Sequence, residues 1–160
     1  MAAHRPSSTK NFDYVFILWG DKFEEAEAAI FATELRRTGL CVKLIGLAGQ
    51  RSTGVHGLVL LSDMTLGEAL PLAHKAICVI IPCNAATAKR IENDPRILDF
   101  FQQANRNGAQ FIMKQVDKTA EPFAAKRLIS ADSITTYTAD DDLTGFARHI
   151  AGLLFDASKA

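Results

Sequence analysis

The sequence has little that would suit a nucleic-acid-binding, membrane or secreted protein. Its 18 basic and 18 acidic side chains balance to a formal net charge of zero, and it has no dense basic patch of the kind that binds nucleic acids. No apolar run approaches the ~18 residues that a membrane-spanning helix needs. Residues 1–11 are mostly polar, unlike a secretory signal. We therefore expect a frayed tail over 1–11 and no nucleic-acid or membrane partner.

The sequence is also poor in cysteine. Cys41, Cys78 and Cys83 are an odd number of cysteines, which argues against a disulfide framework and favours free thiols in a reducing cytoplasm. The spacing of Cys78 and Cys83 is not typical of a zinc site, and only His74 lies near them as a further ligand. We therefore expect a cytoplasmic protein without a metal ion or a cofactor.

The chain opens with a strand–helix–strand unit. Tyr14–Trp19 is continuously apolar, as is typical of a strand covered on both faces. Asp21 and Glu24 have the spacing of a capping box, and the apolar residues of 23–37 follow helical periodicity. A second apolar run covers 40–46. This unit predicts a right-handed crossover between two parallel strands.

The rest of the chain continues the alternation. Thr65 and Glu68 have capping-box spacing, and Asp94 before Pro95 is a typical helix start. We expect strands at 58–61, 76–82, 109–113 and 134–137, loops at 47–54 and 114–122, and helical segments at 65–71, 85–92, 94–107, 123–127 and from 140 onward. This order predicts one α/β domain over 12–157, a three-layer αβα sandwich with a doubly wound, mainly parallel sheet.

Glu27 does not fit its helix. It lies four residues after Phe23 and four before Phe31, on the stripe that should face the sheet. A carboxylate on a buried face needs a partner, because an isolated buried charge is costly. The alternative is that Glu27 lies at the edge of the stripe and reaches solvent.

Several segments of the first half occur together in a pattern typical of one protein family. They are Glu24-Glu25-Ala26-Glu27 and the segments 35–40, 46–49 and 60–66. With them the chain resembles the ThiJ/PfpI family, within the flavodoxin-like class I glutamine amidotransferase-like superfamily. The resemblance implies a reactive cysteine on a sharp turn after a later strand, hydrogen-bonded by the glutamate that matches Glu27. It also implies a Pro-Gly-Gly segment that supplies backbone N–H groups to the site.

The chain departs from this pattern where the chemistry should lie. Lys114 stands where the resemblance implies the cysteine, Pro82-Cys83-Asn84 replaces Pro-Gly-Gly, and no histidine matches the usual catalytic one. Cys78 fits the cysteine motif locally, but the β-branched residues after it favour a buried strand cysteine. We therefore interpret the chain as a divergent member without the nucleophile.

The leading functional interpretation is a non-catalytic or degenerate relative that acts as a binding, regulatory or stress-related module. The residues considered for its site, as ligand-binding or catalytic groups, are Glu27, Cys83, Asn84 and Lys114. We expect Lys114 to face Glu27; the alternative is a solvated loop lysine. A homodimer, a small-molecule ligand and a protein partner are the interactions considered.

Two other functions stay open. The first is a hydrolase- or lyase-type enzyme that acts on small carbonyl, amide or peptide substrates through Cys83, or through Lys114 as a Schiff-base amine. The second is a receiver-like signalling domain, since the run before Asp63 resembles a strand that ends in an acceptor aspartate. In that interpretation Lys114 would be the phosphate-sensing lysine.

Overall fold

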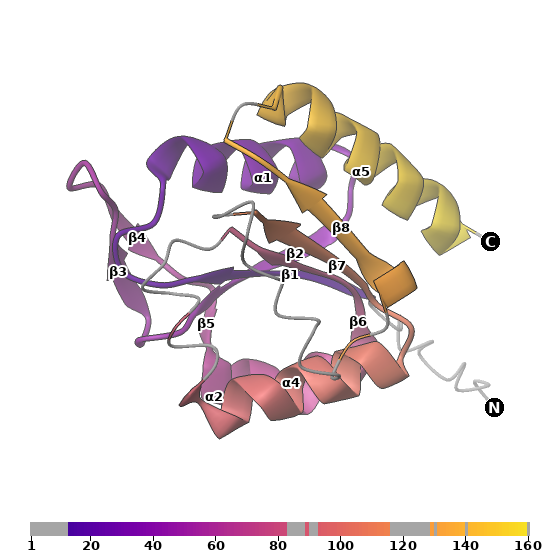
Figure 1. Cartoon of the computed structure of the whole chain (residues 1–160), viewed down its shortest axis with the longest axis horizontal. Helices are drawn as coiled ribbons and strands as arrows, with labels where there is room; N and C mark the ends of the chain where they lie inside the picture. Colours follow the sequence, from indigo (N-terminus) through magenta and orange to yellow (C-terminus); the bar gives the residue numbers. More distant parts are fainter. Residues whose placement is uncertain are drawn as a thin grey trace, which may run out of the picture.

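A six-stranded parallel sheet forms the centre of the protein (Figure 1). The computed structural model describes residues 13–82, 89, 93–115, 129, 131–139 and 141–159. The strands are β1 Tyr14–Trp19, β2 Cys41–Gly46, β3 Arg51–Thr53, β4 Val59–Leu61, β5 Met64–Thr65, β6 Ala76–Ile81, β7 Gln110–Lys114 and β8 Ile134–Tyr137. The helices are α1 Glu25–Arg37, α2 Leu66–Ala69, α4 Pro95–Arg106 and α5 Leu143–Lys159, with 3₁₀ turns η1 Leu70–Lys75 and η3 Ala131–Ser133.

The strand order is β5-β2-β1-β6-β7-β8, with helices on both faces. Helices α1 and α5 pack together over one face, and α2, η1 and α4 cover the other (Figure 1). The two faces have separate apolar clusters, one with Ile17 and Phe31 and the other with Phe16 and Phe100. The predicted three-layer, doubly wound α/β fold is therefore confirmed.

Strand β1 is buried because it has a strand on each side and helices on both faces. It pairs in parallel with β2 and with β6, and Ile17 lies beside Leu44 on one side and Ile80 on the other. The side chains from Val15 to Trp19 are at most 1% exposed. Burying such a side chain contributes roughly 1.5–3 kcal/mol, which is why this run is apolar at every position.

The predicted capping box of Asp21 and Glu24 is wrong. Helix α1 begins at Glu25, and its N-cap Glu24 makes no side-chain capping bond. The Asp21 carboxylate instead accepts the Thr53 N–H at 3.4 Å. The residues before α1 bond to the β3–β4 hairpin, where the Lys22 N–H donates to the Thr53 carbonyl at 2.7 Å. Because they bond there, they are not part of the helix, which starts later than predicted.

The predicted helix starts at Thr65 and Asp94 are confirmed. The Thr65 hydroxyl accepts the Glu68 N–H, and the Glu68 side chain accepts the Thr65 N–H, which completes the capping box of α2. The Asp94 carboxylate accepts the Arg96 N–H at the start of α4, with Pro95 at its first position. Both caps join residues three or fewer apart, so their signals are local in the sequence.

The segment after β2 differs from the prediction. Residues 51–53, expected in a loop, form β3, which pairs antiparallel with β4. This hairpin forms a separate two-stranded sheet at the side of the molecule (Figure 1). Strand β7 also runs one residue further than expected and ends at Lys114.

Some predicted segments lie outside the described residues. They are the tail 1–11, the helical turn 123–127, the start of the last helix at Asp140, and the helical segment 85–92 except Lys89. Among the helices that the structure does describe, none has the length and apolar character that a membrane span requires.

Candidate functional site

The candidate site lies at the carboxyl ends of the parallel strands, beneath α1. In open α/β sheets this edge is where ligands bind, because the strand ends and helix starts form a crevice there. Lys114 is the last residue of β7. Ile112, two residues earlier, packs with the α1 and α5 cluster, whereas Phe111 and Met113 pack on the opposite face. Because side chains alternate along a strand, Lys114 is directed toward α1.

Glu27 of α1 forms an ion pair with Lys114 of β7. It lies on the buried face of α1 together with Ala28 and Phe31. The Lys114 Nζ is 2.6 Å from the Glu27 Oε1, and the two side chains are only 16% and 11% exposed. The predicted contact between these residues is confirmed, and the alternative of a solvated loop lysine is wrong.

No described residue donates a hydrogen bond to the second carboxylate oxygen of Glu27. This Oε2 atom is buried. A buried acceptor without a partner is costly, so the attraction to the Lys114 ammonium is what holds this carboxylate in place. The pair is therefore asymmetric, with one oxygen of the carboxylate ion-paired and the other shielded.

The backbone at Lys114 is that of an ordinary strand. Lys114 lies beside Tyr137 in the register of β7 and β8, and the Gln115 N–H donates to the Tyr137 carbonyl at 2.8 Å. Among the described residues other than glycine, only Lys22 has a positive φ, at 61°. The sheet ladder thus continues past Lys114, without the strained backbone of a nucleophile turn.

Tyr137 closes the site on the β8 side. Its ring packs against Phe31 of α1 at a centroid distance of 5.4 Å and against Phe146 of α5 at 5.5 Å. The sequence analysis did not single out Tyr137 as a neighbour of Lys114. Tyr137 lies beside Lys114 because β7 pairs in parallel with β8. A local sequence pattern does not show which strands are neighbours, so this contact could not be predicted from it.

The structure describes Cys78 but not the proposed site residues Cys83 and Asn84. Cys78 is buried in the middle of β6, as predicted, and this burial raises the pKa of its thiol far above the usual range. A thiol of this kind is structural rather than reactive.

The receiver-like interpretation is wrong. Asp63 immediately precedes β5 at the edge of the sheet, and strands β2, β1 and β6 separate β5 from β7. Its Oδ2 accepts the Leu44 N–H and an Arg36 Nη2–H, both at 2.8 Å. Asp63 therefore binds β2 to the end of α1, and it cannot share a site with Lys114.

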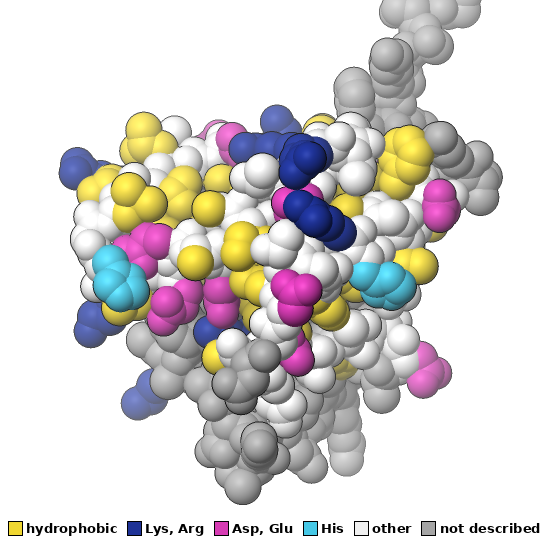
Figure 2. Space-filling model, turned by 90° about the horizontal axis from the view of Figure 1, so that it is seen from above, with side chains coloured by type: hydrophobic (Ala, Val, Ile, Leu, Met, Phe, Trp, Pro, Cys, Tyr) yellow, Lys and Arg dark blue, Asp and Glu magenta, His cyan; other side chains and the backbone are white. Residues whose placement is uncertain are grey.

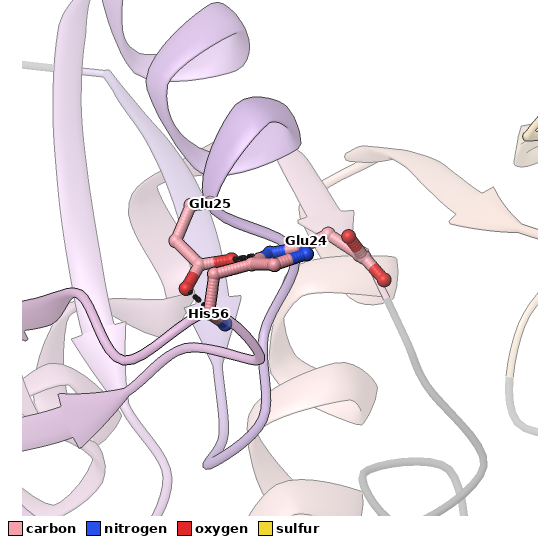
Figure 3. A group of neighbouring side chains, drawn as sticks. All are labelled: Glu24, Glu25 and His56. Atoms are coloured by element: carbon pink, nitrogen blue, oxygen red, sulfur yellow. Dashed lines mark hydrogen bonds and ion pairs between the residues drawn. The ribbon is translucent and has the colours of Figure 1, made fainter.

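A second polar cluster holds the hairpin turn onto α1 (Figure 3). The Glu25 carboxylate accepts the His56 N–H at 2.6 Å and lies 3.0 Å from the His56 Nδ1. Burial works to raise the pKa of Glu25, but the hydrogen bonds from His56 and the backbone outweigh it and lower that pKa to about 2. The same hydrogen bond and the charge of Glu25 raise the pKa of His56.

This cluster includes the only potential metal ligands that lie together among the described residues. Ligand atoms of Glu24, Glu25 and His56 lie within 4.8 Å of one another. The Glu25 oxygens are already hydrogen-bonded to the turn, and Figure 3 shows the Glu24 carboxylate directed away from Glu25. The cluster therefore acts as a clamp on the turn.

Fold and site together define a doubly wound α/β protein with a buried ion pair at the carboxyl edge of its sheet. The family model described as DJ-1/PfpI matches residues 13–137. The chain belongs to the DJ-1/PfpI family, as the resemblance to ThiJ/PfpI proteins predicted.

Solved structures support the same fold. DJ-1beta of Drosophila melanogaster is similar with a TM-score of 0.69 and 16% identity, over 91% of this chain and 90% of that one. Oxidized DJ-1 of Toxoplasma gondii gives 0.71 and 15%, over 91% and 92%. The putative protease I of Bacteroides thetaiotaomicron gives 0.63 and 16%, over 91% and 98%. A search of curated protein sequences gave no match.

Proposed function

We propose that this protein is a non-catalytic DJ-1/PfpI member that acts as a binding or regulatory module. Family membership supports a general DJ-1-like role, stress-related or of protease or chaperone type. The proposal that the protein is non-catalytic depends on the buried pair of Lys114 and Glu27, whose Nζ and Oε1 atoms are 2.6 Å apart. It occupies the place where the family resemblance implies a glutamate and a reactive cysteine.

The chemistry of the pair supports a loss of catalysis. The Lys114 Nζ is held by the Glu27 Oε1 at 2.6 Å, whereas a Schiff-base lysine needs its amine free to attack a carbonyl group. The strand geometry of Lys114 and Gln115 supports the same conclusion, because the ladder to Tyr137 leaves Lys114 without a sharp, exposed turn. For Lys114 to act as a Schiff-base amine, it would have to leave Glu27 and the strand would have to open at its end.

The site retains the ability to bind. The Lys114 ammonium has N–H groups beyond the one directed at Glu27, and its side chain keeps 16% exposure. We propose that a ligand with an oxygen acceptor binds these N–H groups, and that Glu27 positions the lysine. We keep Cys83 and Asn84 in this proposed site on the basis of the sequence. We also propose a cytoplasmic location, because Cys41 and Cys78 are free thiols.

Reductive trapping tests the proposal directly. The protein is incubated with propanal and sodium cyanoborohydride, and adducts are mapped by mass spectrometry, with the exposed Lys22 as the internal reference. We expect Lys114 to be modified more slowly than Lys22, and Glu27→Gln to increase modification at Lys114 because the paired charge is gone. Rapid, selective modification of Lys114 that Glu27→Gln abolishes would overturn the proposal and favour an amine-based enzyme.

Thiol labelling tests the remaining enzyme alternative. Under iodoacetamide at neutral pH we expect Cys83 to react no faster than a free thiol, and the buried Cys78 to react only after denaturation. Labelling of Cys83 well above the rate of a free thiol would indicate an activated nucleophile and favour catalysis.

A further inference from the structure

The turn at the end of α4 contains the one Asn-Gly pair of the sequence. Asn107 precedes Gly108, and no other asparagine of the chain precedes a glycine. Both residues are exposed. Helix α4, which this turn ends, lies on the far side of the sheet from α1 and α5 (Figure 1), and thus from the surface that Figure 2 shows.

An asparagine followed by glycine is prone to deamidation in water. The Gly108 backbone nitrogen, on losing its proton, forms a bond to the Asn107 Cγ, and the Cγ–Nδ2 bond breaks to release ammonia. Water then opens the resulting succinimide ring at either carbonyl group, which leaves an aspartyl or an isoaspartyl residue. Glycine favours this reaction because it has no Cβ to obstruct the approach of its nitrogen.

The fold holds this pair in a conformation that cannot close the ring. Asn107 has a φ of −78° and a ψ of −2°. At a ψ near zero the next nitrogen eclipses the residue's own nitrogen, so the Gly108 nitrogen is directed away from the Cβ branch that carries Cγ. Ring closure therefore requires a rotation of the backbone at Asn107.

Backbone hydrogen bonds of the turn oppose that rotation. The Gly108 N–H donates to the Asn105 carbonyl at 3.0 Å. The Ala109 N–H donates to the Ala104 carbonyl at 3.1 Å. These two bonds form a Schellman motif, in which Gly108 takes a φ of 79°. The nitrogen that would attack is therefore held in the helix cap.

The side chain of Asn107 joins the turn to β6. Its Nδ2 donates to the Ala76 carbonyl at 2.8 Å, and Ala76 is fully buried. An aspartyl carboxylate would take this donor away from the carbonyl, which is costly for a buried acceptor. It would also put a negative charge at the C-terminal end of a helix, where the dipole disfavours it.

The isoaspartyl product changes the main chain itself. Its backbone runs through the former side chain, so the turn between α4 and β7 gains a methylene group. Ala109, which follows directly, is fully buried, and Gln110 is in register with Cys78 of β6. Because the turn has fixed bonds on both sides, either product destabilises it.

We propose that Asn107 is a deamidation site that the native turn keeps closed, and that water modifies it when the C-terminal turn of α4 opens. Because either product destabilises the turn, the modification is a lasting covalent mark of that opening. The fold needs glycine here for the positive φ and asparagine for the bond to β6, so the reactive pair is built into its architecture. The proposal is independent of the Glu27 and Lys114 site.

Mass spectrometry of the full chain during incubation at mildly alkaline pH tests the closed state. The native chain is compared with the chain unfolded in guanidinium chloride and with an acetylated peptide of residues 103–111. We expect the native chain to lose the Asn107 amide at least about tenfold more slowly than the other two, because only the open fraction of the turn reacts. Asn105, which precedes Arg106, is the internal control and should keep its amide throughout.

The product is identified with the Asp-N endoprotease, which cleaves before an aspartyl residue but not before an isoaspartyl residue. Deamidation should therefore give both a new cleavage before position 107 and an uncleaved fragment of the deamidated mass. The deamidated chain has one more negative charge and can be separated by ion exchange. We expect it to melt at a lower temperature than the unmodified chain.

Three outcomes overturn the proposal. A native chain that loses the Asn107 amide as fast as the peptide would show that the turn does not close the site. An unfolded chain that keeps this amide would show that Asn107 is not a modification site. A deamidated chain that melts together with the unmodified chain would show that the turn tolerates the product.

Amide hydrogen exchange tests whether the turn is the gate. The opening that frees the Gly108 N–H for exchange also frees its nitrogen for ring closure. The slowing of deamidation in the native chain should therefore match the exchange protection of the Gly108 N–H. Deamidation slowed far more than this exchange would assign the gate to a larger unfolding and exclude the turn as its site.

Discussion

Replacing Lys114 with methionine should destabilise the protein strongly, because it leaves the Glu27 carboxylate buried without a partner. The two side chains are only 16% and 11% exposed, and the Glu27 Oε2 has no donor among the described residues. Removing one member of a buried ion pair costs about 3–5 kcal/mol. For a chain of this size each kcal/mol lowers the melting temperature by about 2–4 °C, so Lys114→Met should lower it by about 6–20 °C.

The double variant separates the cost of an unpaired charge from the value of the pair. Glu27→Met with Lys114→Met leaves two apolar side chains and no buried charge. Exchanging a buried ion pair for apolar residues of similar volume is often neutral or stabilising. We therefore expect the double variant to be more stable than either single variant.

Urea unfolding followed by tryptophan fluorescence measures these differences, because Trp19 is the single tryptophan and is buried in β1. Arg37→Met is the control, since Arg37 is 64% exposed and its partner Glu34 keeps a second partner, with the Arg148 Nε 3.1 Å from the Glu34 Oε2; losing such an exposed charge should cost at most about 1 kcal/mol. If Lys114→Met costs no more than Arg37→Met, the pair is screened by solvent and the argument from burial fails.

Two further predictions concern the clamp on the hairpin turn and the start of α2. The pKa of His56 is raised in the fold from 6.5, so its pairing with Glu25 stabilises the protein fully below pH 6.5 and is lost as the pH rises through the folded pKa. The melting temperature of the wild type should therefore fall relative to His56→Gln as the pH rises above 6.5, and parallel pH profiles would contradict this. Thr65→Ala should cost about 1 kcal/mol in urea unfolding because it removes the capping box, whereas Thr33→Ala on the exposed side of α1 should not; equal losses would mean that the cap contributes nothing.

Much of the fold was predictable because its signals are local. The apolar run of β1, the capping box at Thr65 and the start of α4 at Asp94 each depend on residues close together in the sequence. The cap predicted from Asp21 and Glu24 had the same spacing and was wrong. Asp21 bonds to Thr53 instead, and no local pattern shows that competition.

The candidate site was predictable in part. The position of Glu27 on an apolar stripe showed that a buried carboxylate needed a partner, and the family resemblance identified Lys114 as the residue at the end of the matching strand. The short strand β3 was missed because its alternation spans only Arg51–Thr53, so its pairing with β4 decides its conformation.

The sequence by itself determined the alternation of strands and helices, the helix starts at Thr65 and Asp94, and the family. These follow from periodicity and hydrogen bonds within a few residues. Only the tertiary structure decided that Asp63 lies far from Lys114, that Tyr137 lies beside it, and that no described strand pairs with the outer edge of β4. Strand order and edge exposure arise from how distant segments pack, and the free energy of that packing is not contained in any single stretch of the chain.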